Sequence, residues 1–275
     1  MTVDGDGLEV ARRLERRQAH STAALADETI EVAGGLASFG GVGAWLNQAC
    51  AVGLDGPVAP GEVERLVAFY AERGVEPKVI LSPFVDPTLL EALGARGFTV
   101  REFETVLARG LEPGEPLAPA VHPPPAGLTL ERVDPADAAA LATYVDVSTA
   151  GFRPEGAPPD PVLSRFVVDH VRRPGVGAVL ARIDGAPVGG GALEVGDGVA
   201  AFMGASVLAA VRRRGVQQAL IARRLELARD AGARLATIQA RPGIPTERNA
   251  ARLGFRVAYT RATVAMAGPG LAPSP

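Results

Sequence analysis

Three consecutive arginines followed by a glycine are the part of this sequence best suited to holding an anion. Residues 211–220 read VRRRGVQQAL, and a helical pattern starts at the glycine, Gly215. The first turn of a helix carries a partial positive charge, so exposed cations there cost roughly 0.3–1 kcal/mol each. The unpaired N–H groups of such a turn bind phosphate, and arginines add paired hydrogen bonds to phosphate oxygens. The segment therefore predicts a phosphate site whose ligand offsets the arginines.

The elements around this segment must bring its backbone and side chains to one place. An apolar strand is predicted before it, over residues 199–207, and a helix after it, over residues 215–231. The other elements predicted in the C-terminal part are strands over residues 128–133, 176–183, 188–195, 235–240, 255–259 and 262–266, and helices over residues 134–149, 161–172 and 246–253. This order indicates a mixed α/β fold, with an antiparallel meander first and a β–α–β–α–β segment after it.

The N-terminal part contains a second, weaker copy of the same chain ending. The stretches ARGFTVREFETVLARG (95–110) and RLGFRVAYTRATVAMAG (252–268) both run helix end, Gly-Phe, strand, turn and strand. We interpret them as a divergent internal repeat, and chance recurrence of such a junction is the alternative. The elements predicted in the N-terminal part are helices over residues 62–73 and from Asp86 to Gly97, a strand over residues 79–81, and two short strands through Leu107.

Residues 207–221, VLAAVRRRGVQQALI, resemble the acyl-CoA-binding motif of the GNAT superfamily of N-acetyltransferases. That motif is a central strand, then Arg/Gln-x-x-Gly-x-Gly/Ala, then a helix. Leu-Gly-Phe at residues 253–255 also follows in the family's order, so the resemblance covers about residues 127–268. It implies a GNAT-like central mixed twisted sheet flanked by helices. With the internal repeat, it implies a tandem arrangement in which the N-terminal copy is degenerate.

The resemblance also implies which residues hold CoA. Backbone groups of a splayed strand end pair with the pantetheine arm in this family, and amides of the following helix hold the pyrophosphate. Arginine side chains bind the pyrophosphate or the ribose 3′-phosphate, and Gly215 stands where a side chain would block the approach. The residues expected to bind CoA are Ser206, Val207, Leu208, Arg212, Arg213, Arg214, Gly215, Val216, Gln217, Gln218 and Asn249.

Two of these residues depart from the family pattern. Gln217 stands where the family favours Gly or Ala, so its side chain must point away from the phosphate or hydrogen-bond to it. Asn249 lies closer to Gly254 than the family's usual asparagine does. The binding half of the motif is nevertheless better preserved than the catalytic half.

The sequence offers only indirect candidates for proton transfer. The long strand carries no carboxylate at residues 201–204, where the family often has a glutamate base, and Ala250 stands at the family's tyrosine position. Glu194, on the neighbouring strand, is the candidate base, and Tyr144 or Tyr259 is the candidate acid. A solvated carboxylate and half-buried structural tyrosines are the alternatives.

Three acidic residues fall in the segment that usually shapes the acceptor site in this family. Asp146, Glu155 and Asp160 could attract a cationic amine, and a solvated surface is the alternative for each. Three glycines at residues 189–191 are not followed by a phosphate-loop lysine or a helix. They are therefore predicted to mark a bulge or a close backbone approach within a strand.

Composition narrows the function classes. The chain of 275 residues has 47% apolar and 21% charged residues with a net charge of −3, which favours a folded core and argues against a general nucleic-acid binder. One cysteine suits a reducing compartment, and no stretch is apolar for the ~20 residues that a membrane helix needs. We expect a cytoplasmic protein without membrane or nucleic-acid partners. The three histidines lack metal-ligand spacing, so no metal is expected.

Proline density sets the expected domain boundaries. Residues 111–127, LEPGEPLAPAVHPPPAG, indicate a semi-rigid linker. The domains predicted are a degenerate GNAT-like domain without a CoA site at 1–112, a linker at 113–126, a catalytic-type GNAT domain at 127–268 and a disordered tail at 269–275. The chain is expected to be a monomer, as a pseudo-dimer within one chain, or a homodimer.

The sequence as a whole favours an acyl-CoA-dependent N-acyltransferase. The expected reaction transfers acetyl from acetyl-CoA to a primary amine, of a small molecule or a peptide, by direct attack in a ternary complex. The alternative is a non-catalytic acyl-CoA-binding sensor or regulatory module. Nothing in the sequence names the amine.

Overall fold

The computed structural model describes residues 7–115, 123–153 and 156–273, which fall into two compact units. The C-terminal unit is Leu107–Val257. The N-terminal unit takes the described residues up to Val106 together with those from Ala258 onward. Part of the predicted linker, residues 116–122, and the acidic candidate Glu155 lie outside the described residues.

The C-terminal unit is built on a mixed sheet in the strand order β5-β10-β9-β8-β7-β6. The meander β6–β9 is antiparallel, and β10 then pairs in parallel with β9, as the sequence predicts. Both hairpins of the meander turn through an Asp-Gly pair with positive φ angles, which suits the twist of antiparallel strands. The strands are β5 (Thr99–Gly110), β6 (Leu128–Arg132), β7 (Val176–Ile183), β8 (Ala186–Gly196), β9 (Val199–Val207) and β10 (Leu235–Ala240).

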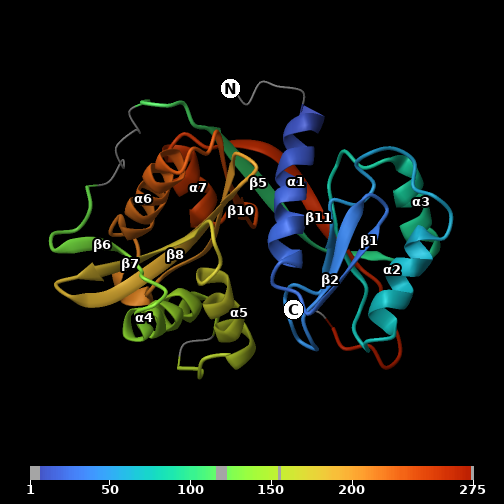
Figure 1. The fold of residues 1–275 in the computed structure, drawn as a ribbon, viewed down its shortest axis with the longest axis horizontal. Helices are drawn as coiled ribbons and strands as arrows, with labels where there is room; N and C mark the ends of the chain where they lie inside the picture. The colour runs from blue at the N-terminus through green and yellow to red at the C-terminus, as the bar shows by residue number, and fades with distance from the viewer. Residues whose placement is uncertain (1–6, 116–122, 154–155, 274–275) are drawn as a thin grey trace. The chain divides into compact units, whose positions relative to one another are not determined.

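Helices cover both faces of this sheet (Figure 1). Alternate residues of β7 show the division, because Leu180 packs with Leu141 of α4 whereas Val179 packs with Val216 and Leu220 of α6. The helices are α4 (Ala138–Thr149), α5 (Pro161–Val171), α6 (Val216–Asp230) and α7 (Pro245–Arg252), with short 3-10 turns η1 (Ala150–Phe152) and η2 (Ala209–Val211). Of the helices in the described ranges, none combines the length and apolar character needed to cross a membrane.

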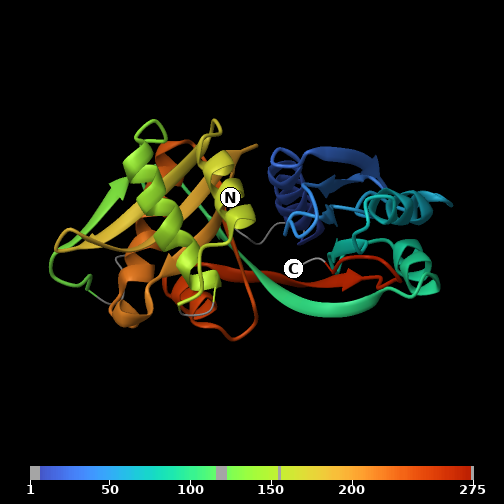
Figure 2. The same ribbon diagram turned by 90° about the horizontal axis from the view of Figure 1, so that it is seen from below.

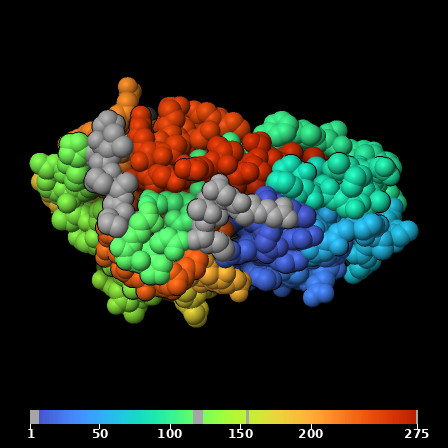
Figure 3. Space-filling model, turned by 90° about the horizontal axis from the view of Figure 1, so that it is seen from above, coloured from blue at the N-terminus to red at the C-terminus, as the bar shows by residue number. Residues whose placement is uncertain are grey.

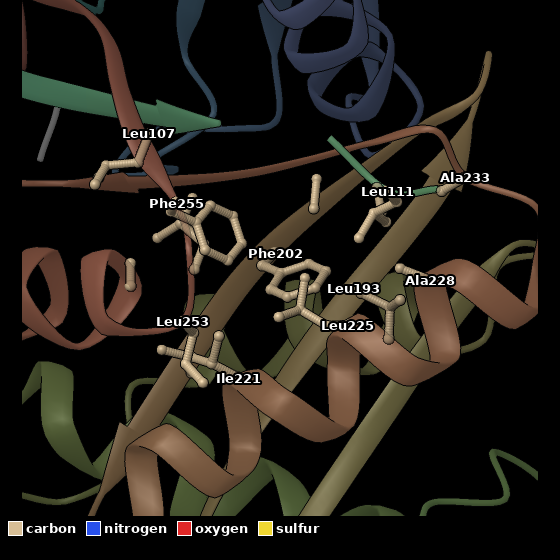
Figure 4. Close-up of a cluster of buried hydrophobic side chains, with 14 of the residues drawn as sticks. Leu107, Leu111, Leu193, Phe202, Ile221, Leu225, Ala228, Ala233, Leu253 and Phe255 are labelled. Carbon is tan, nitrogen blue, oxygen red and sulfur yellow. The ribbon is translucent and has the colours of Figure 1, made fainter. Parts of the chain in front are cut away.

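The core of the C-terminal unit lies between α6 and the sheet. Ile221 and Leu225 of α6 point toward Leu193 and Phe202 of the strands (Figure 4). A buried arginine, Arg224, lies among them. Burial lowers the pKa of its guanidinium to about 10. It donates to the carbonyl oxygens of Leu220 (3.1 Å) and Ala192 (3.0 Å), so the polar head of this core residue is bound to the backbone.

The glycines at 189–191 allow three close approaches, which confirms the prediction from the sequence. A Cβ atom on Gly189 would lie 2.5 Å from the Ser206 carbonyl oxygen, and one on Gly190 would lie 2.8 Å from the Tyr144 ring. A Cβ on Gly191 would lie 3.1 Å from the Arg224 guanidinium. Within this run the pairing of β8 with β9 also shifts register, between Gly190 and Ala192.

The N-terminal unit repeats the pairing plan of the C-terminal unit. Its strand order is β1-β2-β3-β4-β11. β3 is parallel to β4, whereas the pairs β1–β2, β2–β3 and β4–β11 are antiparallel. The sequence analysis missed α1 and β1–β3, because GLASF and QAC are short and rich in small residues. The elements are α1 (Gly7–Ala23), β1 (Glu28–Val32), β2 (Gly35–Phe39), β3 (Gln48–Cys50), α2 (Glu62–Ala71), β4 (Lys78–Leu81), α3 (Pro87–Ala95) and β11 (Arg256–Ala265).

The predicted domain boundaries are corrected by the two long strands, β5 and β11. Each was expected to be two short strands, and each is continuous (Figure 2). The 258–265 portion of β11 belongs to the N-terminal unit, where Val264 pairs with Val79 of β4. The 107–110 portion of β5 belongs to the C-terminal unit, where Leu107 lies in the core with Leu253. Residues 127–268 are therefore not one unit, because each unit includes part of a strand from the other half of the chain.

The chain end is also more ordered than the predicted disordered tail at 269–275. Ala272 donates its N–H to the Gly74 carbonyl oxygen at 2.8 Å and accepts the Glu76 N–H at 3.0 Å. The described residues up to 273 thus continue into the N-terminal unit by backbone pairing.

The internal repeat extends to the way its helices end. Gly97 and Gly254 follow α3 and α7 with φ angles of +77° and +83°. The next residue then donates back across the helix end, Phe98 to the Leu93 carbonyl (3.2 Å) and Phe255 to the Ala250 carbonyl (3.1 Å). Glycine is favoured there because the left-handed conformation strains other residues.

A buried ionic network holds α1 to β11 inside the N-terminal unit. Glu15 of α1 accepts the hydroxyl of Tyr259 at 2.7 Å and the guanidinium of Arg261 at 3.2 Å. Arg261 also donates to Glu104 of β5 at 2.9 Å. Burial opposes its charge, but the two carboxylates hold the pKa of Arg261 above its ordinary value.

Removing the Glu15 carboxylate should be costly. In Glu15→Ala, Arg261 and Tyr259 lose a buried acceptor, and we expect the free energy of unfolding to fall by about 3 kcal/mol. The matched control is Glu9→Ala, an exposed glutamate of the same helix, expected to change it by less than about 1 kcal/mol. Urea denaturation measures both, and equal stability of the two variants would contradict the role given to the network.

Candidate functional site

A pocket of the C-terminal unit, about 670 Å³ in volume, is lined by residues of β9, α6 and α7. It brings together the strand end and the helix start that the sequence singled out. Its lining residues are Gly151, Phe152, Ala205, Ser206, Val207, Val211, Arg212, Arg213, Gly215, Val216, Gln217, Gln218, Pro245, Thr246, Arg248, Asn249 and Arg252. Leu208 and Arg214, also expected at the site, are not among the lining residues.

The strand β9 parts from its parallel neighbour before it reaches this pocket. Pairing of β9 with β10 runs from Val199 with Leu235 to Phe202 with Ile238. β9 itself continues to Val207. On its other side the register with β8 shifts, and Gly204 has a left-handed φ of +61°. The bulge bends β9 and leaves an unpaired edge at its end.

Val207 presents its backbone to that open edge. The next residue, Leu208, donates its N–H to the Val188 carbonyl at 2.9 Å, on the β8 side. Hydrogen-bonding groups of successive residues point to opposite sides of a strand, so those of Val207 face away from β8. Ser206 contributes differently, because its hydroxyl accepts the Gly151 N–H at 2.9 Å. Of the three residues expected to present backbone groups, Val207 is the one placed to do so.

The helix α6 begins without a side-chain cap. Gly215 is its N-cap residue in the left-handed conformation, with φ of +84°. The first helical bond runs from Ala219 to the Gly215 carbonyl at 3.0 Å. The amides of residues 216–218 therefore have no helical acceptor and carry the positive end of the helix dipole. This is the geometry of an anion site, and it requires glycine at 215 for conformational reasons.

Cations surround the uncapped turn. Arg212, Arg213 and Arg214 are all exposed, and Arg213 holds a left-handed φ of +63°. Two more arginines of the pocket, Arg248 and Arg252, come from α7 and were missed by the sequence analysis. Their spacing of four residues on a predicted helix could have indicated a shared face. In Figure 3, the red-orange segment of α7 forms part of the outer surface. No carboxylate occurs among the described lining residues.

The side chain of Gln217 points toward α7. Its amide nitrogen donates to the Thr246 hydroxyl at 2.9 Å, and its amide oxygen accepts from Asn249 at 2.6 Å. Asn249 also accepts from Gln218 at 3.1 Å. The long side chain at 217 is thus directed into a polar contact between two helices, while Asn249 lines the pocket and holds both glutamines.

The two catalytic candidates lie elsewhere. Glu194 is 2% exposed and pairs with Arg173 at 3.1 Å, with His170 at 3.9 Å. Tyr144 is 1% exposed, packs against Gly190, and burial raises the pKa of its phenol. A proton carrier must come within roughly 2.6–3.2 Å of the reacting group, and neither residue lines the pocket. We therefore correct both assignments to buried structural roles.

The remaining candidates are also engaged in local structure. Tyr259 lies in the N-terminal unit, bound to Glu15. Asp146 pairs with Arg153 at 3.0 Å, and Asp160 caps α5 through the Val162 amide. Within the described ranges, no group of three or more His, Cys, Asp or Glu side chains could hold a metal ion.

The corresponding helix of the N-terminal unit supplies its own anion. α2 also begins after an uncapped left-handed glycine, Gly61, with φ of +89°. Its first residue, Glu62, accepts the Ala33 N–H and an Arg65 N–H, both at 2.6 Å. The Ala33 N–H, followed by Arg65, lowers the pKa of Glu62. The first turn of α2 thus carries acidic residues, Glu62 and Glu64, whereas the first turn of α6 carries none, which fits the expectation that only one unit binds CoA.

We compared the chain with protein-family models and with curated protein sequences. The sequence model of the Acetyltransferase (GNAT) family matches residues 142–255. No curated protein sequence matches the chain.

Solved structures of similar fold cover most of the chain. A GCN5-related N-acetyltransferase from Kribbella flavida is 23% identical, covers 96% of this chain and 98% of its own, and has a TM-score of 0.69. One from Sphaerobacter thermophilus is 17% identical, covers 82% and 75%, and scores 0.60. A tandem GNAT protein from the clavulanic acid biosynthesis pathway is 19% identical, covers 98% of each chain and scores 0.61. The predicted tandem GNAT-like fold is confirmed.

The two uncapped glycines give a matched test of the site. Gly215→Ala and Gly61→Ala each force alanine into a left-handed conformation, and each should cost about 1–2 kcal/mol of stability. Only Gly215→Ala disturbs the pocket, so only it should weaken CoA binding, by about tenfold. Denaturation and calorimetric titration with CoA measure the two effects. Equal loss of CoA affinity in both variants would contradict the assignment.

Proposed function

We propose that the C-terminal unit is an acyl-CoA-dependent N-acyltransferase, because the sequence model of the Acetyltransferase (GNAT) family matches its residues 142–255. Its proposed donor is acetyl-CoA, and its proposed acceptor is a primary amine of a small molecule or peptide. The amine attacks the thioester directly while both substrates are bound.

One observation carries this proposal: the open edge of β9 and the uncapped start of α6 meet in one pocket. An acyl-CoA has a matching pair of features, an extended arm with amide groups and a pyrophosphate. Val207 offers a backbone N–H and C=O for the arm. The amides of residues 216–218 offer donors for the phosphates. Arg212 and Arg213 add charge-assisted hydrogen bonds.

The proposed reaction needs few catalytic side chains. The amine nitrogen forms a bond to the thioester carbonyl carbon, the C–S bond breaks, the sulfur leaves as a thiolate, and the amine loses one proton. Holding the two reactants in place can supply much of the rate. With no carboxylate or tyrosine among the described lining residues, we propose that water accepts the proton.

The absence of carboxylates and tyrosines from the described lining also favours a second candidate function, that of a non-catalytic acyl-CoA-binding protein. A domain that binds acyl-CoA and transfers nothing needs the phosphate and pantetheine contacts but no proton carrier. A non-catalytic acyl-CoA sensor or regulatory module would have this pocket. Turnover separates the two candidates.

Binding and turnover are tested in sequence. Acetyl-CoA at ~100 times its dissociation constant should stabilise the protein by roughly 2.7 kcal/mol. A panel of small-molecule and peptide amines then tests for release of the CoA thiol, detected with a thiol reagent. The protein's own Cys50 is buried with its pKa raised to about 12, so it should not react with the reagent in the folded state. Stabilisation without thiol release would favour the sensor, and no stabilisation would contradict both functions.

The position of Tyr144 gives a second expected outcome. Because its ring packs against Gly190 and it does not line the pocket, Tyr144→Phe should keep kcat/KM within about threefold of the wild type. Removing a general acid typically costs 10²–10⁴-fold. A loss of that size in steady-state kinetics, with unchanged stability, would restore Tyr144 as the acid.

A further inference from the structure

Arg212 covers a carbonyl at the open edge of β9, that of Val207. Its Nε donates to the Val207 carbonyl oxygen at 3.0 Å. Val207 is also the residue whose backbone groups face the open edge, since Leu208 pairs with β8. An arm that docks along β9 therefore meets a guanidinium at the acceptor that its amide would use.

We propose that Arg212 determines specificity for phosphate-bearing thioesters by acting as a latch on this edge. In the free protein its side chain holds the Val207 carbonyl. A phosphate at the start of α6 draws the guanidinium away, and the carbonyl becomes available to the amide of the arm. The proposal rests on the proposed function, because it assigns an order of contacts to the same pocket.

The balance of hydrogen bonds favours this exchange. The contact with Val207 joins a cation to a neutral carbonyl. A phosphate oxygen carries its own negative charge, and a phosphate often accepts two parallel guanidinium hydrogen bonds, so that contact is stronger. Arg212 is exposed, so burial does not fix its side chain. The described lining of the pocket includes no carboxylate, so an incoming phosphate competes with no acidic side chain of that lining.

An alternative interpretation of the contact between Arg212 and Val207 predicts the opposite result for a thioester without phosphate. A carbonyl oxygen has two lone pairs, so Val207 could accept from Arg212 and from the arm together. Arg212 would then only add affinity. The two readings differ for a thioester without phosphate: a latch hinders it, whereas a shared carbonyl does not.

The experiment measures acetyl-CoA and S-acetylpantetheine binding by calorimetric titration to wild type, Arg212→Ala and Arg214→Ala. Arg212→Ala should weaken acetyl-CoA by roughly tenfold or more, because a charge-assisted contact is lost. It should strengthen S-acetylpantetheine by about two- to tenfold, because the carbonyl is free. Arg214→Ala removes the same charge from an exposed residue outside the described pocket lining. It should not strengthen S-acetylpantetheine.

Coupling between the binding of inorganic pyrophosphate and the binding of S-acetylpantetheine gives an independent test of the latch. Inorganic pyrophosphate should raise the affinity of wild type for S-acetylpantetheine, since it removes Arg212 from Val207. Linkage requires S-acetylpantetheine to raise pyrophosphate affinity by the same factor. In Arg212→Ala this coupling should disappear.

The outcomes separate the latch from the proposed function. Opposite changes for the two thioesters in Arg212→Ala, with coupling in wild type alone, support the latch. Weaker or unchanged S-acetylpantetheine binding in Arg212→Ala overturns the latch, while acyl-CoA binding by wild type leaves the proposed function standing. Wild type that binds neither thioester overturns both.

Discussion

The parting of β9 from β10 after Phe202 is the constraint on which the pocket depends. Parallel strands that stay paired leave no backbone groups for a ligand. Here the left-handed Gly204 and the register shift beside it turn β9 away, and α6 starts beyond the strand end. Buried contacts hold α6 to the sheet near this point. Arg224 of α6 binds the Ala192 carbonyl of β8 and lies 4.8 Å from the ring centre of Phe202 in β9. Gly191 makes room for the Arg224 guanidinium, since a Cβ atom there would lie 3.1 Å from it.

Much of the C-terminal unit could be predicted from sequence, because its signals are local. The limits of β7, β9 and β10 agree with the apolar runs, and Gly215 marked the start of α6. Strand partners were not predictable in the same way. Which strand completes each sheet depends on contacts between residues far apart in the chain, such as Val79 with Val264. The orientation of Gln217 and the burial of Glu194 and Tyr144 also depend on neighbours that periodicity does not reveal.

The two units show how one scaffold can keep or lose a ligand site through a few residues. Gly61 and Gly215 present equivalent uncapped helix starts. In α2 the dipole is met by Glu62, which is covalently part of the helix and never dissociates. In α6 the first turn has no acidic residue and arginines precede it. An internal carboxylate gives stability without dependence on solute, whereas an arginine-rich turn is stabilised further by any anion that binds to it.

The composition of the units also bears on how the chain folds during synthesis. The N-terminal unit includes the 258–265 portion of β11, so its sheet lacks a strand until the ribosome has passed residue 265. At roughly 5–20 residues per second, the edge of β4 then waits about 10–35 seconds for its partner. Unpaired edges invite pairing with other chains. If the two halves were expressed separately, the N-terminal half would lack the 258–265 portion of β11 and the edge of β4 would stay unpaired. The two halves must therefore be made as one chain for the sheet of the N-terminal unit to be completed.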